Sequence, residues 1–241
     1  MKILQLNMWG GRLGKPIIDL FKREKADIIC IQEAIDIPGG WAFFFESLSD
    51  IKTQAGYQHC FFTPVFGYKV MNRRAKGGPA ILSNLPFSET HETFTRLAYV
   101  EDFDLLGGDY NIRCLQHAVV EHGGQKLNIL NHHGHQIPEH KNGDEETMRQ
   151  CKMIVEYLQK LSGPVVLCGD FNLAPDSESL EQINKVLVNQ SKKSGVTTTR
   201  TPLTHKTEVC DYIFTSPDIE VESFHILDDI VSDHKALTLE F

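Results

Sequence analysis

Few of the features that assign a protein to a class at first sight are present in this sequence. Its 241 residues contain no run of about 18 apolar residues, so no membrane-spanning helix is expected. The first residues, MKILQLNMWGG, lack the apolar core and small-residue cleavage site of a secretion signal. No low-complexity segment or charged linker divides the chain, which predicts one domain over residues 1–241.

Cysteine pairs of the CxxC type are also missing. The six cysteines are scattered, and several lie within apolar runs, where a thiol packs as a small hydrophobic group. This spacing argues against a structural zinc site and against a disulfide framework. We therefore expect a cytoplasmic protein with free thiols at Cys30, Cys60, Cys114, Cys151, Cys168 and Cys210.

An excess of positive charge is absent as well. The chain has 24 Lys and Arg against 32 Asp and Glu, which gives a formal net charge of -8. A protein that binds duplex nucleic acid mainly by neutralising phosphates usually carries a basic surface. The acidity argues against that class, although part of it can belong to metal ligands, so charge alone does not exclude a nuclease.

What the sequence does contain is an alternation of strand-length and helix-length apolar segments, which is typical of α/β proteins. Two glycines at 123–124 predict a hairpin between two of the strands. We expect a polar loop near 189–206. The predicted strands are 2–7, 27–33, 57–63, 79–83, 112–121, 126–133, 165–169, 210–215, 220–226 and 235–240, and the predicted helices are 16–25, 41–50, 144–161 and 177–188.

Polar clusters stand where several of these apolar strands end, which is where active sites of α/β proteins are assembled. Each cluster alone is also compatible with an ordinary cap or turn. Together, their carboxylates and amides suit a hard cation such as Mg²⁺ and predict attack on phosphorus. The clusters are Asn7, Gln32-Glu33, His132-His133, Gly169-Asp170-Phe171-Asn172 and Ser232-Asp233-His234.

The order of the motifs resembles that of the endonuclease/exonuclease/phosphatase superfamily. LNMWG is followed by IQE, GGPAILS, LNHHG, GDFN, CDYIF and SDH, and the match extends from Asn7 to His234. It is closer to the deoxyribonuclease-like and sphingomyelinase-like branches than to abasic-site endonucleases, whose tyrosine-containing motif is absent. The resemblance implies a four-layer α/β/β/α sandwich with two facing mixed β-sheets and the site at one rim.

The resemblance also implies a metal site. Glu33 and Asn7 would hold Mg²⁺, with Mn²⁺ as the alternative ion, and Asp233 would support it or a second ion. Such an ion offsets negative charge as the phosphorus atom becomes five-coordinate.

Five further residues would carry the chemistry. By the same resemblance, Asp170 and Asn172 would place the attacking water, and His234 would contact the scissile phosphate. The match to CDYIF suggests Asp211 as the partner of His234, since a neighbouring carboxylate raises the pKa of an imidazole and keeps it protonated. His133 would bind phosphate or protonate the leaving oxygen. A one-residue shift of the strand would bring His132 to the site instead, because adjacent strand residues face opposite sides.

Three functions are compatible with these residues. The first is a Mg²⁺-dependent hydrolase of a small or lipid-derived phosphate ester, the second is a DNA or RNA nuclease with the same site, and the third is a binding protein without catalysis. The third is the weakest, because every polar position that the mechanism needs is occupied. No protein partner is predicted.

Two other groups of residues favour structural roles. The cations Arg73, Arg74 and Lys76 could receive an anionic substrate but are more typical of solvated surface. The aromatic run of Trp41 and residues 43–45 could stack on a base or a lipid but is more typical of a core.

Overall fold

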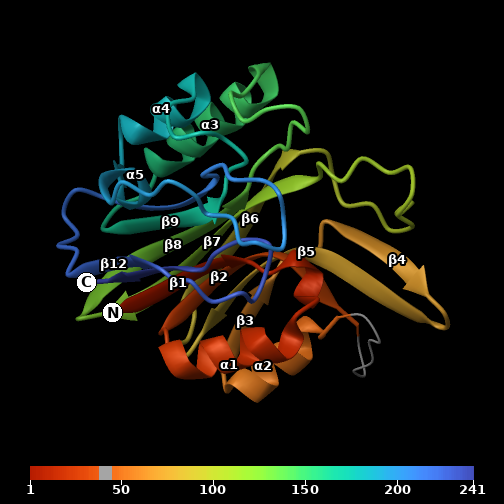
Figure 1. Cartoon of the computed structure of the whole chain (residues 1–241). Helices are drawn as coiled ribbons and strands as arrows, with labels where there is room; N and C mark the ends of the chain where they lie inside the picture. Colours follow the sequence, from red (N-terminus) through yellow and green to blue (C-terminus); the bar gives the residue numbers. More distant parts are fainter. Residues whose placement is uncertain (38–44) are drawn as a thin grey trace.

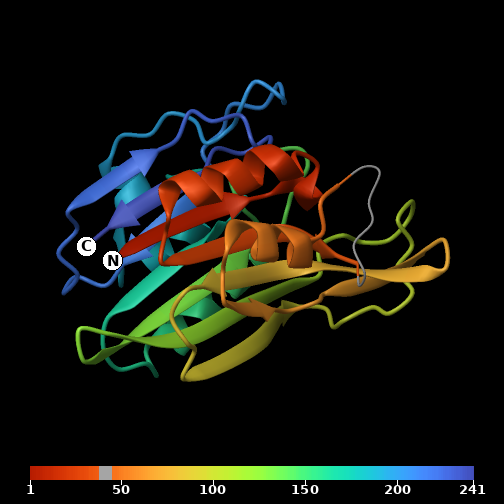
Figure 2. The ribbon, with the colours of Figure 1, turned by 90° about the horizontal axis from the view of Figure 1, so that it is seen from below.

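Two β-sheets lie face to face and helices cover their outer surfaces (Figures 1 and 2). The computed structural model describes residues 1–37 and 45–241. Both sheets are mixed, with parallel and antiparallel neighbours. This is the four-layer α/β/β/α arrangement that the sequence resemblance implied.

The first sheet combines strands from both ends of the chain. Its order is β12 (Ser223–Ile226), β13 (Leu237–Glu240), β1 (Lys2–Asn7), β2 (Ile28–Asp36), β5 (Arg73–Ser83) and β3 (His59–Phe62), with β4 (Phe66–Val70) paired to the first part of β5. Helices α1 (Gly14–Glu24) and α2 (Leu48–Ala55) cover its outer face (Figure 1). Because β1 and β2 are parallel, they end at the same rim of the sheet.

The second sheet is formed by the middle of the chain. Its order is β10 (Val188–Asn189), β11 (Asp211–Thr215), β9 (Val165–Asp170), β8 (Gln125–His133), β7 (Arg113–His122) and β6 (Glu89–Arg96). Helices α3 (Glu145–Leu158), α4 (Glu178–Asn184) and α5 (Gln190–Lys193) lie on the outer side of this sheet (Figure 1). Strands β8 and β9 are parallel and also end at one rim.

Local sequence signals explain where the longer helices begin and end. Helix α3 starts at a capping box, in which the Asp144 carboxylate accepts a hydrogen bond from the backbone of Thr147 and the Thr147 hydroxyl accepts one from the backbone of Asp144. Helix α1 buries Ile17 and Phe21 against the first sheet and ends at Lys25, which adopts a left-handed conformation.

Apolar side chains fill the space between the two sheets. Cys168 is fully buried there, as its place in an apolar strand predicted. The interior members of this core include Ile3, Cys30, Ile81, Ala118, Ile129, Val166, Cys168, Ile213 and Leu237. Within the described parts of the chain, no helix is long and apolar enough to cross a membrane.

A chain of buried amides also joins the sheets. The Asn131 side chain in the second sheet donates to the carbonyl oxygens of Ile31 (2.9 Å) and Ala80 (3.1 Å) in the first sheet. Its Oδ1 accepts a hydrogen bond from Gln32 Nε2 at 2.7 Å. Gln5 Nε2 in turn donates to Gln32 Oε1 at 2.7 Å. Because an unpaired buried polar group is unfavourable, these contacts favour one alignment of the two sheets.

Most predicted elements are confirmed, with differences of a few residues at their ends. Three predictions need correction. The predicted helix 41–50 falls partly outside the described residues, and the observed helix begins at Leu48 and continues to Ala55. The predicted loop 189–206 contains the short helix α5. Strand β6 was not predicted because its sequence, ETHETFTR, is mostly polar and charged. Strand β4 was also not predicted, although Phe66, Tyr68 and Val70 are residues that favour strands.

We expect Asn131→Leu to reduce the free energy of unfolding by about 3 kcal/mol, because the near-isosteric side chain leaves several buried polar groups without partners. Urea unfolding followed by fluorescence measures this change. The matched control is Asn84→Leu at an exposed position, which should shift the free energy by less than about 0.5 kcal/mol. Equal stability of the two variants would contradict a stabilising role of the amide chain.

Candidate active site

Strand register brings the predicted polar clusters together at one rim. In the second sheet, Asp170 is paired with His133 on parallel β8 and with Asp211 on antiparallel β11. In the first sheet, Asn7 is paired with Gln32 on parallel β2. Asn7, His133 and Asp170 end strands β1, β8 and β9, and Asp211 begins β11. Since the sheets face each other, these strand termini meet across the space between them.

A β-bulge directs Glu33 toward this rim. The pairing of β2 with β5 shifts register between Ile31 and Ala34, and Glu33 has a φ of 56°. Positive φ is uncommon for a residue with a side chain, and such strain concentrates at functional sites. The Glu33 Oε1 atom accepts a hydrogen bond from Asn7 Nδ2 at 3.1 Å.

Asn7 connects two carboxylates that come from different sheets. Its Nδ2 donates to Glu33 Oε1 and also to Asp170 Oδ2, the second at 3.1 Å. The other carboxylate oxygen of Asp170 accepts a hydrogen bond from the backbone N–H of Asn172 at 2.9 Å. Asn172 has a φ of 55°, so the turn after β9 folds back on the carboxylate. The predicted residues Asn7, Glu33, Asp170 and Asn172 therefore lie in one connected group.

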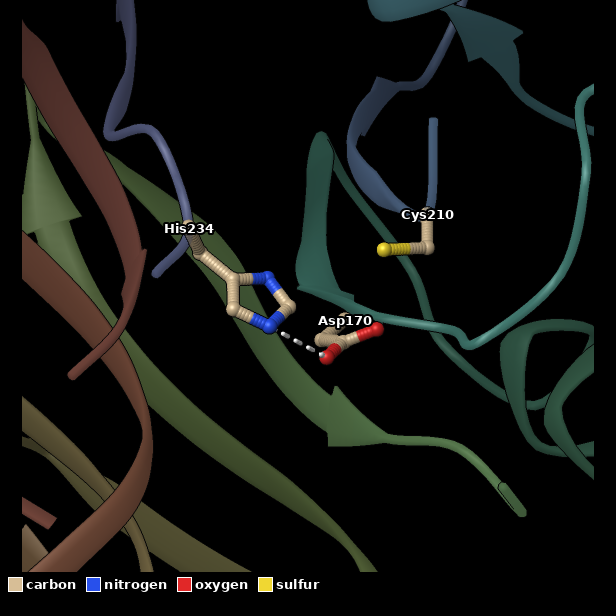
Figure 3. Close-up of side chains that lie close together, drawn as sticks. All are labelled: Asp170, Cys210 and His234. Atoms are coloured by element: carbon tan, nitrogen blue, oxygen red, sulfur yellow. Dashed lines mark ion pairs between the residues drawn. The ribbon is translucent and has the colours of Figure 1, made fainter. Parts of the chain in front are cut away.

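The His234 ring lies between two buried carboxylates. Its Nδ1 is 2.9 Å from Asp211 Oδ2. Its Nε2 is 3.6 Å from Asp170 Oδ2, a contact that is visible in Figure 3. Burial by itself favours the neutral ring, but Asp211 and Asp170 outweigh it and raise the pKa of His234 to about 9. The two carboxylates therefore favour the protonated imidazole, while burial and the positive charge of Arg200 oppose it.

Further hydrogen bonds fix Asp211 in position. Its Oδ2 accepts one from the Thr199 hydroxyl at 2.6 Å, and its Oδ1 accepts one from Gln5 Nε2 at 3.1 Å. The chain of buried amides between the sheets thus ends at the partner of His234. Asp233, beside His234 in the sequence, has a side chain that is 20% exposed, and its Oδ1 is 4.0 Å from His234 Nε2.

His133 faces the site and His132 does not. His133 Nε2 is 3.8 Å from Glu33 Oε1 and 3.9 Å from Asp170 Oδ2. The His132 ring has its Nδ1 3.1 Å from the Cys114 carbonyl oxygen. The predicted strand register is therefore correct.

The environment of His133 also defines its protonation. Its Nδ1 is 3.2 Å from Arg113 Nη1, and a guanidinium only donates, so Nδ1 accepts and the proton resides on Nε2. Burial, together with the positive charge of Arg113, holds the pKa of His133 well below its usual value. A neutral ring can donate a hydrogen bond from Nε2, but it is a poor proton source. Of the two roles that the sequence suggested for His133, this favours binding of phosphate over protonation of the leaving oxygen.

Three buried cations at the site were missed by the sequence reasoning. Arg200 approaches His234 Nε2 closely and is 3.7 Å from Asp233 Oδ2. Lys141 Nζ donates to Asn172 Oδ1 at 2.7 Å, and Arg113 contacts His133 as described. Arg113 opens a strand, and the other two lie in connections between elements, where cations normally face solvent. Nothing in their local sequence indicates burial.

Opposite charges are balanced at Asp170. Burial alone opposes its ionisation, but His234 and the cations around it outweigh that effect, so the pKa of Asp170 lies well below its ordinary value.

The pKa of Glu33 shifts in the opposite direction. Loss of hydration raises its pKa, and although His234 and Asn7 oppose the shift, the carboxylates of Asp170 and Asp233 add to it. Loss of hydration is therefore the main cause of the raised pKa of Glu33, and the two neighbouring carboxylates contribute less.

Figure 3 shows a second group of possible metal ligands. One ligand atom each from Asp170, Cys210 and His234 lies within 4.8 Å of the others. Cys210 Sγ is 3.5 Å from Asp211 Oδ2, and burial, reinforced by the neighbouring aspartates, raises the pKa of its thiol well above the usual value. This thiol is protonated in the structure, whereas a metal-binding cysteine is a thiolate. The oxygen ligands around Asn7 are better suited to a hard cation.

Comparison with solved structures shows the same fold in other proteins. An endonuclease/exonuclease/phosphatase family protein from Leptotrichia buccalis C-1013-b is 17% identical, with a TM-score of 0.71 over 100% of this chain and 99% of the other. The mannosyl-6-phosphatase of Bacteroides thetaiotaomicron VPI-5482 is 17% identical, with a TM-score of 0.71 over 100% and 98%. The human Nocturnin catalytic domain with bound sulfate is 19% identical, with a TM-score of 0.69 over 99% and 93%.

At these identities, similarity of structure establishes the fold alone. Among proteins with curated descriptions, none matches the sequence. The sequence profile described as "Endonuclease/Exonuclease/phosphatase family" matches residues 4–234, which include the predicted site residues from Asn7 to His234. The chain therefore belongs to the endonuclease/exonuclease/phosphatase family, whose members are hydrolases of phosphate ester bonds.

Proposed function

We propose that the protein is a divalent-metal-dependent hydrolase of small phosphate esters and that Mg²⁺ is its preferred ion. The observation that carries the proposal is the contact of one amide, Asn7 Nδ2, with the carboxylates of both Glu33 and Asp170 beside a protonated His234. One small volume thus contains metal ligands, a carboxylate that can bind water and a cation that can bind the phosphate.

The donor set at this position fits a hard cation. Glu33, Asp170 and Asp233 repel one another, and this repulsion contributes to the raised pKa of Glu33. A divalent cation would remove the repulsion, and all the nearby carboxylate and amide oxygens are ligands that Mg²⁺ accepts. Asn7 and Glu33 would hold the ion and Asp233 would support it. When bound, the ion would polarise a phosphoryl oxygen as a Lewis acid.

Asp170 and Asn172 are assigned to the attacking water. The low pKa of Asp170 keeps it ionised at physiological pH, so it can accept a hydrogen bond from water. The same low pKa makes Asp170 a weak base, so its uptake of the water's proton would depend on a divalent ion that lowers the pKa of the water. The backbone N–H of Asn172 holds one carboxylate oxygen, which fixes the direction of the other. The Asn172 side chain is held in turn by Lys141.

His234 and Arg200 are assigned to the phosphoryl group. Negative charge accumulates on the equatorial oxygens of this group as the fifth bond to phosphorus forms. Buried cations stabilise that charge, and because they are already in place, they do not have to reorganise during the reaction. Asp211 keeps His234 protonated and oriented. The neutral His133 can donate from Nε2 to an oxygen of the same group or of the leaving group.

A nuclease is the second candidate. The cations Arg113, Lys141 and Arg200 would accept a phosphodiester as readily as a monoester. The formal charge of -8 supports a small ester over duplex DNA, because sequence-independent duplex binding depends on many phosphate contacts. An activity panel with Mg²⁺ on plasmid DNA, abasic DNA, RNA, sphingomyelin, inositol phosphates and nucleotide or sugar monophosphates tests the proposal and separates the candidates.

We expect Glu33→Gln to weaken Mg²⁺ binding and to lower turnover by at least about a hundredfold, because it removes a charged ligand. Calorimetric titration with Mg²⁺ measures binding, and thermal melting checks the fold. Glu121→Gln, at an exposed position on β7, should preserve both properties. Wild-type turnover of Glu33→Gln at limiting Mg²⁺ would refute the ligand assignment.

We expect Asp170→Asn to lower turnover by more than about a hundredfold with little change in KM. The amide can accept a hydrogen bond from water but cannot take its proton, so the loss falls on the transition state. Steady-state kinetics separates kcat from KM, and Asp176→Asn at an exposed position serves as the matched control. Near-normal turnover of Asp170→Asn would overturn the mechanism.

The His234 ring should titrate with a pKa of about 9 in the metal-free protein, which proton or nitrogen NMR can follow. Because this pKa lies above the ordinary value of 6.5, the stabilisation from its protonation is complete below about pH 6.5 and is lost as the pH rises through about 9. Asp211→Asn should lower the pKa, and Asp218→Asn at an exposed position should not. If His234 in the wild-type protein titrated with a pKa near 6.5, its pairing with Asp211 would not stabilise the protonated ring.

A further inference from the structure

A cavity of about 430 Å³ opens beside the catalytic rim. Its volume falls in the range of sites for small organic ligands. Glu33 and His133, which belong to the proposed active site, also line this cavity, so a group placed in it would be adjacent to the reacting phosphate. Most of its remaining wall comes from the turn after β1, from β4 and β5, and from the loop that leads into β7.

The wall of the cavity is rich in aromatic rings. The rings that line it are Trp9, Phe45, Phe66, Tyr68 and Tyr110. Of the aromatic run noted in the sequence, Phe45 therefore contributes to a ligand cavity, and residues 41, 43 and 44 lie outside the described part of the chain.

Several of these rings are held in place by one another. Phe66 stacks on Phe103 with centroids 4.7 Å apart and meets Tyr110 edge to face at 6.0 Å. The Phe66 ring rests against Gly77 of β5, where a Cβ atom would lie 2.3 Å from the ring, so only glycine permits this position. The aromatic wall is therefore preorganised.

The aromatic wall is coupled directly to the catalytic rim. The backbone N–H of Trp9 donates to Asn7 Oδ1 at 3.1 Å, and Trp9 has a φ of 50°. The Arg12 guanidinium lies 4.3 Å from the centroid of the Trp9 ring. A ligand that displaced the Trp9 ring would also disturb Asn7.

One buried cation stands between the cavity and the proposed phosphate site. Arg113 lines the cavity, is 6% exposed and contacts His133 through Nη1. Its Nε has no hydrogen-bond partner among the described residues. A buried donor without a partner indicates that an acceptor from a ligand completes it.

From these features, and resting on the function proposed above, we infer that the substrate is a phosphate ester whose organic part carries one planar aromatic ring system, and that this ring binds in the cavity. Aromatic side chains on the wall favour a flat aromatic group, which can stack on a ring or meet its edge. The phosphate then lies toward Arg113, His133 and His234, and the ring lies toward Tyr68 and Phe66.

Other substrate classes fit the cavity poorly. A sugar or inositol ring can also pack a C–H face on an aromatic ring, but its several hydroxyl groups need hydrogen-bond partners, which the aliphatic side chains of Val65 and Ile112 do not supply. A duplex is excluded from a space of about 430 Å³. The inference thus separates this chain from its structural neighbour described as a mannosyl-6-phosphatase.

Two adjacent leucines offer a matched pair of variants. Leu105 lines the cavity and is 44% exposed, whereas Leu106 is fully exposed and does not line it. Leu105→Trp should fill part of the cavity, and Leu106→Trp should leave it open. Both changes add the same side chain to the same surface loop, so a difference between them reports on the cavity rather than on the loop.

The test compares two monophosphates that differ only in an aromatic base, 5′-AMP and ribose 5-phosphate. Calorimetry in EDTA measures their binding to the metal-free protein without turnover. Wild type and Leu106→Trp should bind 5′-AMP about tenfold more tightly than ribose 5-phosphate, a factor typical of one stacked base. Leu105→Trp should reduce affinity for 5′-AMP alone and remove the difference.

Equal affinity of wild type for the two compounds, or equal losses in both leucine variants, would overturn the inference. Hydrolysis of either compound with Mg²⁺ is then measured separately. Turnover without preference for the base would reject the inference and leave the proposed function intact. Preferential binding of 5′-AMP without hydrolysis of any ester in the panel would retain the aromatic site and reject the proposed function.

Discussion

The site depends on a chain of buried hydrogen bonds that fixes one β-sheet against the other. Asn131 joins the sheets by donating to backbone carbonyl oxygens across the interface, and Gln32 and Gln5 continue the chain to Asp211. An apolar core alone would tolerate small shifts of one sheet over the other, because dispersion contacts have little directional preference. Hydrogen bonds between amides are directional, so they set the alignment on which Asn7, Glu33, Asp170 and His234 depend.

Charge at the rim is arranged so that each group stabilises the protonation state that the proposed chemistry needs. Asp211 and Asp170 keep His234 protonated, and the surrounding cations keep Asp170 ionised. On the other side, loss of hydration raises the pKa of Glu33 and the carboxylates of Asp170 and Asp233 add to the shift, a condition that a divalent ion would relieve. The buried groups are therefore interdependent, and the loss of one changes the protonation of the others.

Three residues with strained backbone lie where the two sheets contribute to the site. Trp9, Glu33 and Asn172 all have positive φ values, and all three directly follow or interrupt strands that end at the rim. Each strained residue turns a side chain or an N–H group inward: Glu33 toward Asn7, Asn172 toward Asp170, and Trp9 toward the cavity. The surrounding sheets supply the stability that keeps these conformations populated.

By itself, the sequence determined the fold class and predicted the rim at which the candidate site residues meet, because alternating apolar segments specify strands and helices and because the ordered motifs stand near the ends of strands. It also favoured His133, which the structure places beside Glu33 and Asp170, since strand alternation sends His133 and His132 to opposite faces. Only the tertiary structure decided that Arg113, Lys141 and Arg200 are buried at the site, because burial of a cation depends on carboxylates that lie far away in the chain. The aromatic cavity was likewise beyond the sequence, because its rings come from several separate segments that only the folded chain brings together.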